Sequence, residues 1–349
     1  MVQNAPRQSI QNLLNTTFTG RRINAEVEGI FVTELSELLL QKLTKDSRIE
    51  IAEHINNHPE EFEKVVNHAF SEDFKLKKSL LDIVDLLNGT QVVQVIEQAI
   101  VDDDVSIRRY GLQAAYRTRI DSLNDQVMEI LSNKEEAFEV RKWAIHILAS
   151  TDPEYYCSQI VRITRNKEED VNIRKEAIFA LTQIVNDKTL GTLCILLGDS
   201  DVEIRQSGAW ALSNIGSSDS INCLLSALDD EDELVRDWAI RGLRDMDDAR
   251  ALQGLADAIH TSPPKEQVRM TRLVVERKSE VILRAIVELL SSKDTHVRCT
   301  AAWALGVSPY PPAVPSLKEL LDDESEAVRD YARIALIRSG GLDPTDLQL

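Results

Sequence analysis

The sequence has few of the residues that interrupt helices or favour strands. Its 349 residues include only 13 glycines and 10 prolines, and 5% are aromatic. Glycine and proline are the residues least compatible with a helix interior, and aromatic residues are enriched in strands. Their scarcity favours a helical protein over an all-β fold. No run approaches the roughly 18 consecutive apolar residues that a membrane-spanning helix needs, so we expect no membrane partner.

Positive charge is also scarce. The 40 Lys and Arg residues are outnumbered by 58 Asp and Glu residues, which gives a formal net charge of -18 and a pI of about 4.8. Proteins that bind nucleic acids generally neutralise phosphates with a basic surface. We therefore expect no nucleic-acid partner. A second interpretation of the acidity is solubility of a long, exposed molecule.

Cysteine is present at only four positions, which are Cys157, Cys194, Cys223 and Cys299. They form no CxxC pair, and the N-terminus carries no secretory signal. We predict that all four are buried, small apolar residues in a reducing compartment, and that the protein is soluble and cytoplasmic.

The sequence does contain a repeated pattern, which is clearest in residues 199–216, DSDVEIRQSGAWALSNIG. An acidic residue is followed five positions later by a branched apolar residue, then at once by Arg, and then by an Ala/Leu face. Alignment on that Arg selects eight positions at intervals of 33, 33, 31, 31, 33, 29 and 31 residues, which are Arg108, Arg141, Arg174, Arg205, Arg236, Arg269, Arg298 and Arg329. Such a period predicts a solenoid of stacked units.

Each regular unit is predicted to contain a first helix rich in Leu, Ile and Val, an acidic turn, and a second helix that carries the Arg. We predict an N-terminal arm or capping segment over residues 1–30, the solenoid over 31–340 and a C-terminal tail over 341–349. The turn at residues 260–267 contains two prolines and lacks the usual acidic residue. This difference predicts a bend or a longer exposed loop.

The paired helices, the acidic turns and the Arg six residues later resemble HEAT repeats, specifically the short variety named after phycobilisome lyases. The resemblance covers about residues 31–340 and implies an all-α, right-handed solenoid of about nine stacked helix pairs. In that family, the turn carboxylate and the following basic residue form a hydrogen-bonded ladder between adjacent repeats. This structural role transfers to Asp102, Asp199, Asp230 and Asp323, with Arg108, Arg205, Arg236 and Arg329. Pro263 and Ser292 replace the carboxylate in two repeats, so the resemblance does not extend the pairing to Arg269 and Arg298.

The sequence offers little for catalysis. None of its six histidines is followed by Glu, unlike the several His-Glu pairs of HEAT-like di-iron hydroxylases. His54 and His58 are one helical turn apart but have no evident third metal ligand. Phosphate-binding, dinucleotide-binding, serine-hydrolase and zinc-protease motifs are all missing. We therefore predict no catalytic residues, no metal and no cofactor, and an enzyme is the less favoured class.

The remaining signal lies on the predicted surface. Positions one, five and eight after the aligned Arg point away from the core, because successive helical residues are about 100° apart. In HEAT solenoids the second helices line the concave face, so the resemblance places these positions in a groove. The basic and aromatic members predicted to bind a partner there are Arg109, Lys142, His146, Lys175, Phe179, Trp210, Arg241, Arg244, Arg277 and Trp303. An alternative for the two tryptophans is packing against a neighbouring second helix.

Two functional hypotheses follow. The preferred one is a non-enzymatic scaffold or adaptor whose groove holds a protein or peptide segment with acidic residues and apolar anchors. The other follows from the resemblance to phycobilin lyase subunits, and it is a chaperone-like factor that handles a tetrapyrrole and its acceptor protein. A chromophore-dependent absorbance change on mixing with a bilin would distinguish the two.

Overall fold

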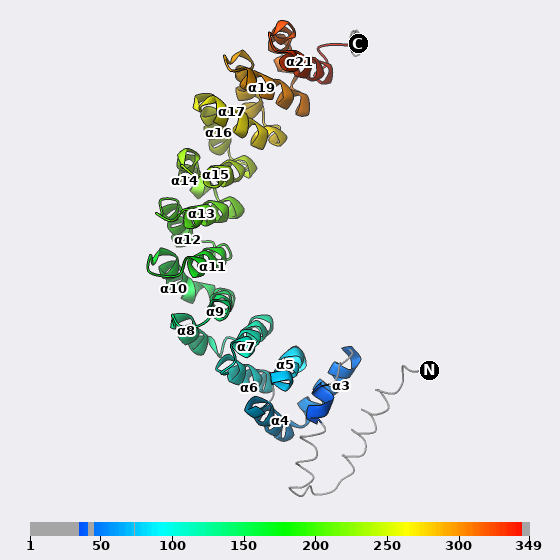
Figure 1. Cartoon of the computed structure of the whole chain (residues 1–349), viewed down its shortest axis with the longest axis vertical. Coiled ribbons are helices and arrows are strands. Elements are labelled where there is room, and N and C mark those ends of the chain that lie inside the picture. Colours follow the sequence, from blue (N-terminus) through cyan, green and yellow to red (C-terminus); the bar gives the residue numbers. More distant parts are fainter. Residues whose placement is uncertain (1–34, 41–44, 73, 344–349) are drawn as a thin grey trace, which may run out of the picture. The chain divides into compact units, whose positions relative to one another are not determined.

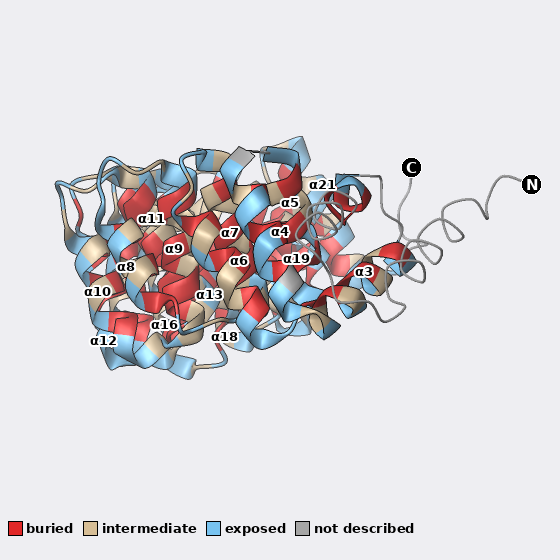
Figure 2. Cartoon of the chain, turned by 90° about the horizontal axis from the view of Figure 1, so that it is seen from below, coloured by how far each residue is buried: buried red, intermediate tan, exposed pale blue. Residues whose placement is uncertain are grey.

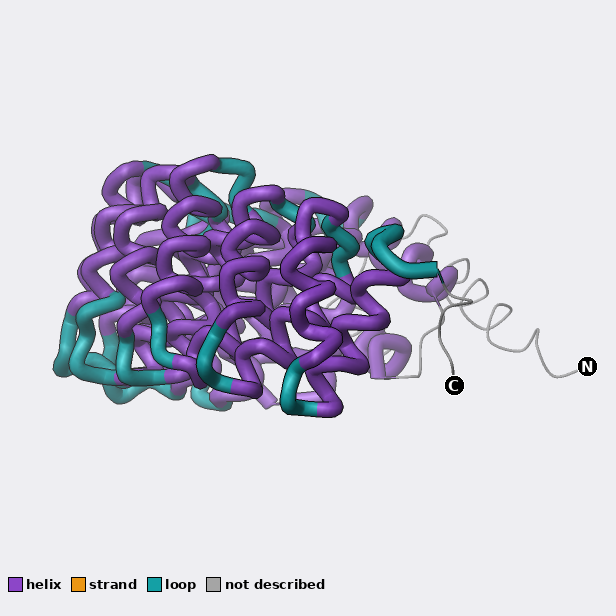
Figure 3. Tube along the Cα trace, turned by 90° about the horizontal axis from the view of Figure 1, so that it is seen from above, coloured by secondary structure: helices purple, strands orange, loops and turns teal. Residues whose placement is uncertain are grey.

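The computed structural model describes residues 35–40, 45–72 and 74–343. The predicted arm at 1–30 and residues 344–349 of the predicted tail lie outside this part of the chain. The chain divides into two compact units, residues 1–158 and 159–349, which are treated separately below. Throughout the described residues the regular structure is helical, with loops between the helices and no strand (Figure 3).

The N-terminal unit is built from helix pairs, with residues 35–40 also helical. Its helices are α3 (Lys45–Asn57), α4 (Pro59–Glu72), α5 (Phe74–Ile83), α6 (Gly89–Ile100), α7 (Val105–Thr118), α8 (Asn124–Ser132) and α9 (Phe138–Thr151). Helix α10 (Pro153–Arg165) begins in this unit and ends in the next.

The C-terminal unit continues the same alternation of first and second helices (Figure 1). Its helices are α11 (Val171–Leu181), α12 (Asp187–Leu196), α13 (Val202–Ile215), α14 (Ile221–Ser226), α15 (Glu233–Asp245), α16 (Ala249–Thr261), α17 (Pro264–Val274), α18 (Glu280–Glu288), α19 (Thr295–Val307), α20 (Val314–Glu319) and α21 (Glu326–Arg338). In the described residues, α4 to α21 make nine pairs in which the even-numbered helix comes first. The prediction of an all-α solenoid is confirmed.

The acidic turns begin the second helices. In five of them an Asp four residues before the aligned position is the N-cap, and its side chain accepts a hydrogen bond from a backbone N–H of the first helical turn. These residues are Asp104, Asp170, Asp201, Asp232 and Asp294. A carboxylate there satisfies otherwise unbonded N–H groups and complements the positive end of the helix dipole. Capping of the second helices therefore explains why an acidic residue recurs in the sequence.

Small residues allow the second helices to pack closely. In α13 the buried positions are Ile204, Arg205, Gly208, Ala209, Ala211 and Leu212. A Cβ added at Gly242 in α15 would lie 3.0 Å from the Cα of Ser213 in α13, so a side chain here would require the two helices to move slightly apart. Buried residues recur along the helices, between exposed residues (Figure 2). The Ala-rich face of the repeat is therefore a packing surface.

The turn with two prolines differs from its prediction. Helix α16 ends at Thr261 and α17 begins at Pro264, so Ser262 and Pro263 alone connect them. Proline is suited to the first position of a helix, because the N–H that it lacks would have no partner within the helix. The predicted longer loop was wrong, because the prolines start a helix here.

The repeat alignment was also wrong in α17. The other second helices carry the aligned basic residue three positions after their first residue, as Arg205 follows Val202 in α13. The equivalent position in α17 is Gln267, three residues after Pro264. Gln267 lies 31 residues after Arg236 and 31 before Arg298, so the uneven intervals of 33 and 29 become equal. Met270, Thr271 and Val274 are buried as this register requires.

Two cysteines depart from their prediction. Cys194 in α12 and Cys223 in α14 form a disulfide, with their Cα atoms 5.6 Å apart. Their separation of 29 residues is close to one repeat, which brings them together on adjacent first helices. Cys157 is buried as predicted, and Cys299 is partly buried. The disulfide removes the cysteine-based support for a reducing, cytoplasmic compartment.

Candidate functional site

With the corrected register, one position on the second helices of the C-terminal unit recurs every 31 residues. It lies five residues after the aligned position and holds Phe179, Trp210, Arg241, Arg272, Trp303 and Ile334. We call these six residues the second-helix row. Phe179 is 43% exposed and Ile334 45%, the two arginines are exposed, and the two tryptophans are partly exposed. Solvent therefore reaches the row in all six helices.

Arg272 is the member that sequence reasoning missed. Alignment on Arg269 placed Met270 and Val274 on the outward face, whereas both are buried. Their burial turns Arg272 to solvent instead. An exact 31-residue period from Arg236 to Arg298 could have revealed this from the sequence.

Aromatic side chains lie at one end of the row. The rings of Phe179 in α11 and Trp210 in α13 are stacked, with centroids 5.6 Å apart and planes inclined by 13°. Trp210 thus packs against a neighbouring second helix, which was the alternative interpretation, and yet it stays partly exposed. The stack forms an accessible aromatic surface that joins two repeats.

The middle of the row carries two positive charges. The guanidinium of Arg241 lies 5.5 Å from the centroid of the Trp238 ring. Asp237 and Asp245 stand one helical turn before and after Arg241, but Asp237 accepts a hydrogen bond from Arg269 and Asp245 pairs with Arg244 at 2.7 Å. Within the described residues, Arg241 and Arg272 have no carboxylate partner. Both guanidinium groups are therefore available to an external anion.

The other predicted cations of this unit are already engaged. Lys175 pairs with Glu203 at 2.7 Å. Arg244 also donates to the carbonyl of Leu273 at 2.9 Å. Arg277 donates to Asp247 at 3.2 Å, and it lies in the short 3-10 helix Val275–Arg277 after α17 rather than on the row. These residues flank the row and are not equivalent to Arg241 and Arg272.

Three predicted residues belong to the N-terminal unit. The guanidinium of Arg109 lies 4.8 Å from the Tyr110 ring centroid, and Lys142 lies 6.0 Å from that of Phe138. The His146 ring contacts the ring of Trp143, with centroids 6.1 Å apart. His146 lies five residues after Arg141, the equivalent position on α9, whereas the second-helix row as defined above contains only residues of the C-terminal unit.

The buried arginines link consecutive repeats. Arg205 donates from Nε to Asp230 of the next repeat at 2.9 Å, and from a terminal nitrogen to the carbonyl of Asp199 in its own turn at 3.0 Å. Arg205 therefore bonds a backbone oxygen in its own turn and a carboxylate in the turn of the next repeat. Because the Arg205 and Asp230 side chains are only 9% and 11% exposed, each would leave a buried charge if the other were removed.

The same arrangement recurs along the chain. Arg298 pairs with Asp323 at 2.7 Å and bonds the carbonyl of Ser292 at 3.0 Å, so a serine in the turn still supports the arginine. Arg174 reaches Asp199 at 2.5 Å. Comparable contacts are Lys77 with Asp102, Arg108 with the Asp102 carbonyl and Glu136, Arg236 with the Asp230 carbonyl and Glu266, and Arg329 with the Asp323 carbonyl.

The arginines alter the acidity of their partners. The hydrogen bond from Arg298 lowers the pKa of Asp323, with a further contribution from the backbone N–H of Ser325. At Asp199 burial opposes ionisation, but the hydrogen bonds from Arg174 and from the backbone N–H of Asp201 outweigh it and lower the pKa. Both carboxylates are therefore charged at neutral pH, as the pairing requires.

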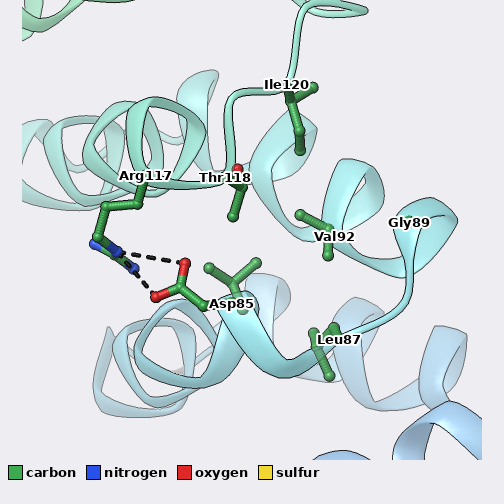
Figure 4. Close-up of a pocket in the computed structure, with 8 residues that line it drawn as sticks. Asp85, Leu87, Gly89, Val92, Arg117, Thr118 and Ile120 are labelled. Carbon is green, nitrogen blue, oxygen red and sulfur yellow. Dashed lines mark hydrogen bonds and ion pairs between the residues drawn. The ribbon is translucent and has the colours of Figure 1, made fainter.

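A small cavity in the N-terminal unit offers no clear chemistry. It has a volume of about 400 Å³ and is lined by the segment 84–87 that follows α5, by the start of α6 and by the end of α7, where Asp85 and Arg117 form an ion pair at 3.1 Å (Figure 4). Each side chain of this pair is nearly half exposed. Within the described residues, no cluster of His, Cys, Asp and Glu could hold a metal ion, and no helix is both long and apolar enough to cross a membrane.

Comparison with known proteins identifies the repeats. The HEAT-repeat family matches residues 160–244, 190–273 and 252–337, which together span just over half of the chain. No curated protein matches. Solved structures that match include Kap95p bound to RanGDP, with a TM-score of 0.54 and 14% identity over 97% of this chain and 49% of that chain. The karyopherin Kap121p, bound to the extreme C-terminus of the protein phosphatase Cdc14p, also has a TM-score of 0.54 and 14% identity, over 97% of this chain and 44% of that one.

This chain thus spans about half the length of these karyopherins or less. At such low identity the similarity concerns the fold alone, and it agrees with the paired helices described above. On the family match, the chain belongs to the HEAT-repeat family.

Proposed function

We propose that this chain is a non-enzymatic scaffold that holds a protein or peptide segment against the second-helix row. The observation that carries the proposal is the composition of that row. In a chain with a net charge of -18, its six positions hold two arginines without a carboxylate partner, three aromatic residues, one isoleucine and no acid. Exposed aromatic and Arg residues are the types most enriched at sites that dominate binding energy.

The charge distribution supports an acidic partner. The carboxylates nearest in sequence to Arg241 are bonded to other arginines, so they do not cancel its charge. A local positive field attracts an acidic segment, which the negatively charged remainder of the protein's surface repels. The apolar residues at both ends of the row can then bind apolar anchors in that segment. We therefore propose a partner that is acidic and has apolar anchors.

Two of the similar structures contain a polypeptide partner. The matching structures contain Kap95p with RanGDP, and Kap121p with the end of Cdc14p. These are polypeptide partners of those proteins, held by the same type of fold. For this chain a polypeptide partner is a proposal that rests on the second-helix row.

The proposal is tested by comparing what two matched variants capture. Arg241→Glu with Arg272→Glu reverses both charges of the row. Arg250→Glu with Arg284→Glu makes the same change of net charge on first helices α16 and α18, where both side chains are at least 66% exposed. Each full-length variant is used to capture proteins from a lysate, with quantification by mass spectrometry.

We expect a partner that wild type and the Arg250/Arg284 variant retain, that the Arg241/Arg272 variant loses, and that moderate salt releases. Equal capture of every protein by the two variants would contradict the proposal. The tetrapyrrole hypothesis stays a prediction, which the absorbance of a bilin mixed with the purified chain tests.

A further inference from the structure

The regular spacing of the second-helix row sets a length scale for its ligand. Phe179, Trp210, Arg241, Arg272, Trp303 and Ile334 occupy equivalent positions on consecutive second helices. Packed helices lie about 8–10 Å apart. Arg241 and Arg272 are therefore separated by about 9 Å at their backbones, and Trp210 and Trp303, three helices apart, by about 27 Å. Figure 1 shows α13, α15, α17 and α19 following one another in this order.

One peptide conformation matches this spacing. In a polyproline II helix every third side chain faces the same side, and three residues advance about 9.3 Å. Three such steps cover about 28 Å, close to the distance from Trp210 to Trp303. In a β-strand, residues three apart point to opposite faces, and residues two apart advance only about 6.7 Å. In an α-helix, residues seven apart advance about 10.5 Å, so three steps would overshoot by roughly 4 Å.

The chemistry along the row is symmetrical. At one end the stacked rings of Phe179 and Trp210 form an apolar surface, and at the other end stand Trp303 and Ile334. Between them lie the guanidinium groups of Arg241 and Arg272, which can each bind a carboxylate through two parallel hydrogen bonds. A ligand therefore needs apolar groups at its two ends and two carboxylates in the middle.

We propose that the second-helix row binds a polyproline II segment with an apolar side chain at position 1, Asp or Glu at positions 4 and 7, and an apolar side chain at position 10. This inference rests on the proposed function, and it adds the conformation and register of the bound segment. A segment that already populates polyproline II loses little conformational entropy on binding. Proline is therefore favoured at the positions between the anchors.

Selection from random peptides tests the register directly. The full-length chain is immobilised and used to select from a library of 16-residue peptides, and the Arg241→Glu/Arg272→Glu variant removes background binders. We expect enrichment of acidic residues three apart, with an apolar residue three positions outside each. Synthetic peptides of identical composition, with the acids two, three or seven residues apart, are then compared by fluorescence polarisation.

The three-residue spacing should bind at least tenfold more tightly than the other two spacings, and proline at the intervening positions should strengthen binding further. The Arg241→Glu/Arg272→Glu variant should lose at least tenfold in affinity, while Arg250→Glu/Arg284→Glu should bind like wild type. Selected peptides that need Arg241 and Arg272 but show another spacing would overturn the register and leave the proposed function standing. If no peptide is enriched, or if every peptide binds the Arg241→Glu/Arg272→Glu variant as tightly as wild type, both proposals fail.

Discussion

Gln267 and Ser292 are 25 residues apart, the same separation that joins Arg205 to Asp230 and Arg298 to Asp323. At this one link between repeats, both the arginine and the carboxylate are replaced by neutral residues. A buried arginine or carboxylate without its partner would cost several kcal/mol, so loss of both together is the tolerable change. Gln267 still donates to the carbonyl of His260 at 3.1 Å, much as the arginines bond their own turns.

Restoring this link should stabilise the C-terminal unit. The double variant Gln267→Arg with Ser292→Asp places the usual pair between α17 and the turn before α19. We expect a favourable coupling of about 1 kcal/mol or more between the two substitutions, as is typical of residues in one ion-pair network. Chemical denaturation of the two single variants and the double variant measures it. Strictly additive effects would show that the two side chains do not meet.

An existing link provides the converse test. Arg205→Ala leaves Asp230 buried without its partner, and we expect a loss of about 3 kcal/mol in the free energy of unfolding. The control is Arg250→Ala, whose side chain is 66% exposed and which should leave the denaturation midpoint close to that of wild type. If both variants unfold at the same denaturant concentration, the buried pair contributes nothing to stability.

Much of the fold could be predicted from the sequence, because a single helix pair repeats. The acid before each second helix, the apolar residue before the arginine and the Ala-rich face are all local features. None of them recurs in α17, because its turn lacks the acid, Glu266 precedes the aligned position, and the buried face consists of Met270, Thr271 and Val274. Arg269 lies two residues past the aligned position, where it bonds Asp237 and Glu266 instead of the next turn. An alignment on one residue type could not recognise Gln267 as the equivalent.

The prediction of the candidate site depended on the same alignment of the repeats. Phe179, Trp210, Arg241 and Trp303 were predicted from regular repeats and lie on one row. Arg272 was missed because of the shift in α17. The contacts of Arg277 with Asp247 and of Arg244 with the Leu273 carbonyl could not be predicted, because they depend on how adjacent repeats meet. The Cys194–Cys223 disulfide was missed because the separation of 29 was not compared with the repeat length.

Stability should fall in acid. Because Arg298 lowers the pKa of Asp323 in the folded chain, this carboxylate stabilises the protein at pH values above its unfolded pKa of about 4. The contribution is lost as the pH falls through the lower folded pKa. Denaturant unfolding from pH 7 to pH 3 measures the effect. The Asp323→Asn variant should be less stable at pH 7, and its free energy of unfolding should depend less on pH than that of wild type. An equal dependence on pH in the two proteins would argue against the Arg298–Asp323 pair.

The disulfide should stabilise the C-terminal unit. It closes a separation of 29 residues between Cys194 and Cys223, for which chain entropy predicts about 3.6 kcal/mol. Under oxidising conditions Cys194→Ser should unfold at lower denaturant than wild type, and a reducing agent should abolish the difference. Cys157→Ser is a control for cysteine replacement outside the disulfide. A difference between Cys194→Ser and wild type that persists in reductant would point to packing instead.

The most direct test of the central claim is the affinity of the recovered partner, or of a selected peptide, for Trp303→Ala. Trp303 belongs to the second-helix row and is not part of the Phe179–Trp210 stack, so its truncation disturbs less of the fold. With unchanged circular dichroism and unfolding, we predict a loss of about 2 kcal/mol or more, which is roughly 30-fold in affinity. An affinity equal to that of wild type would place the binding surface away from this row and contradict the account.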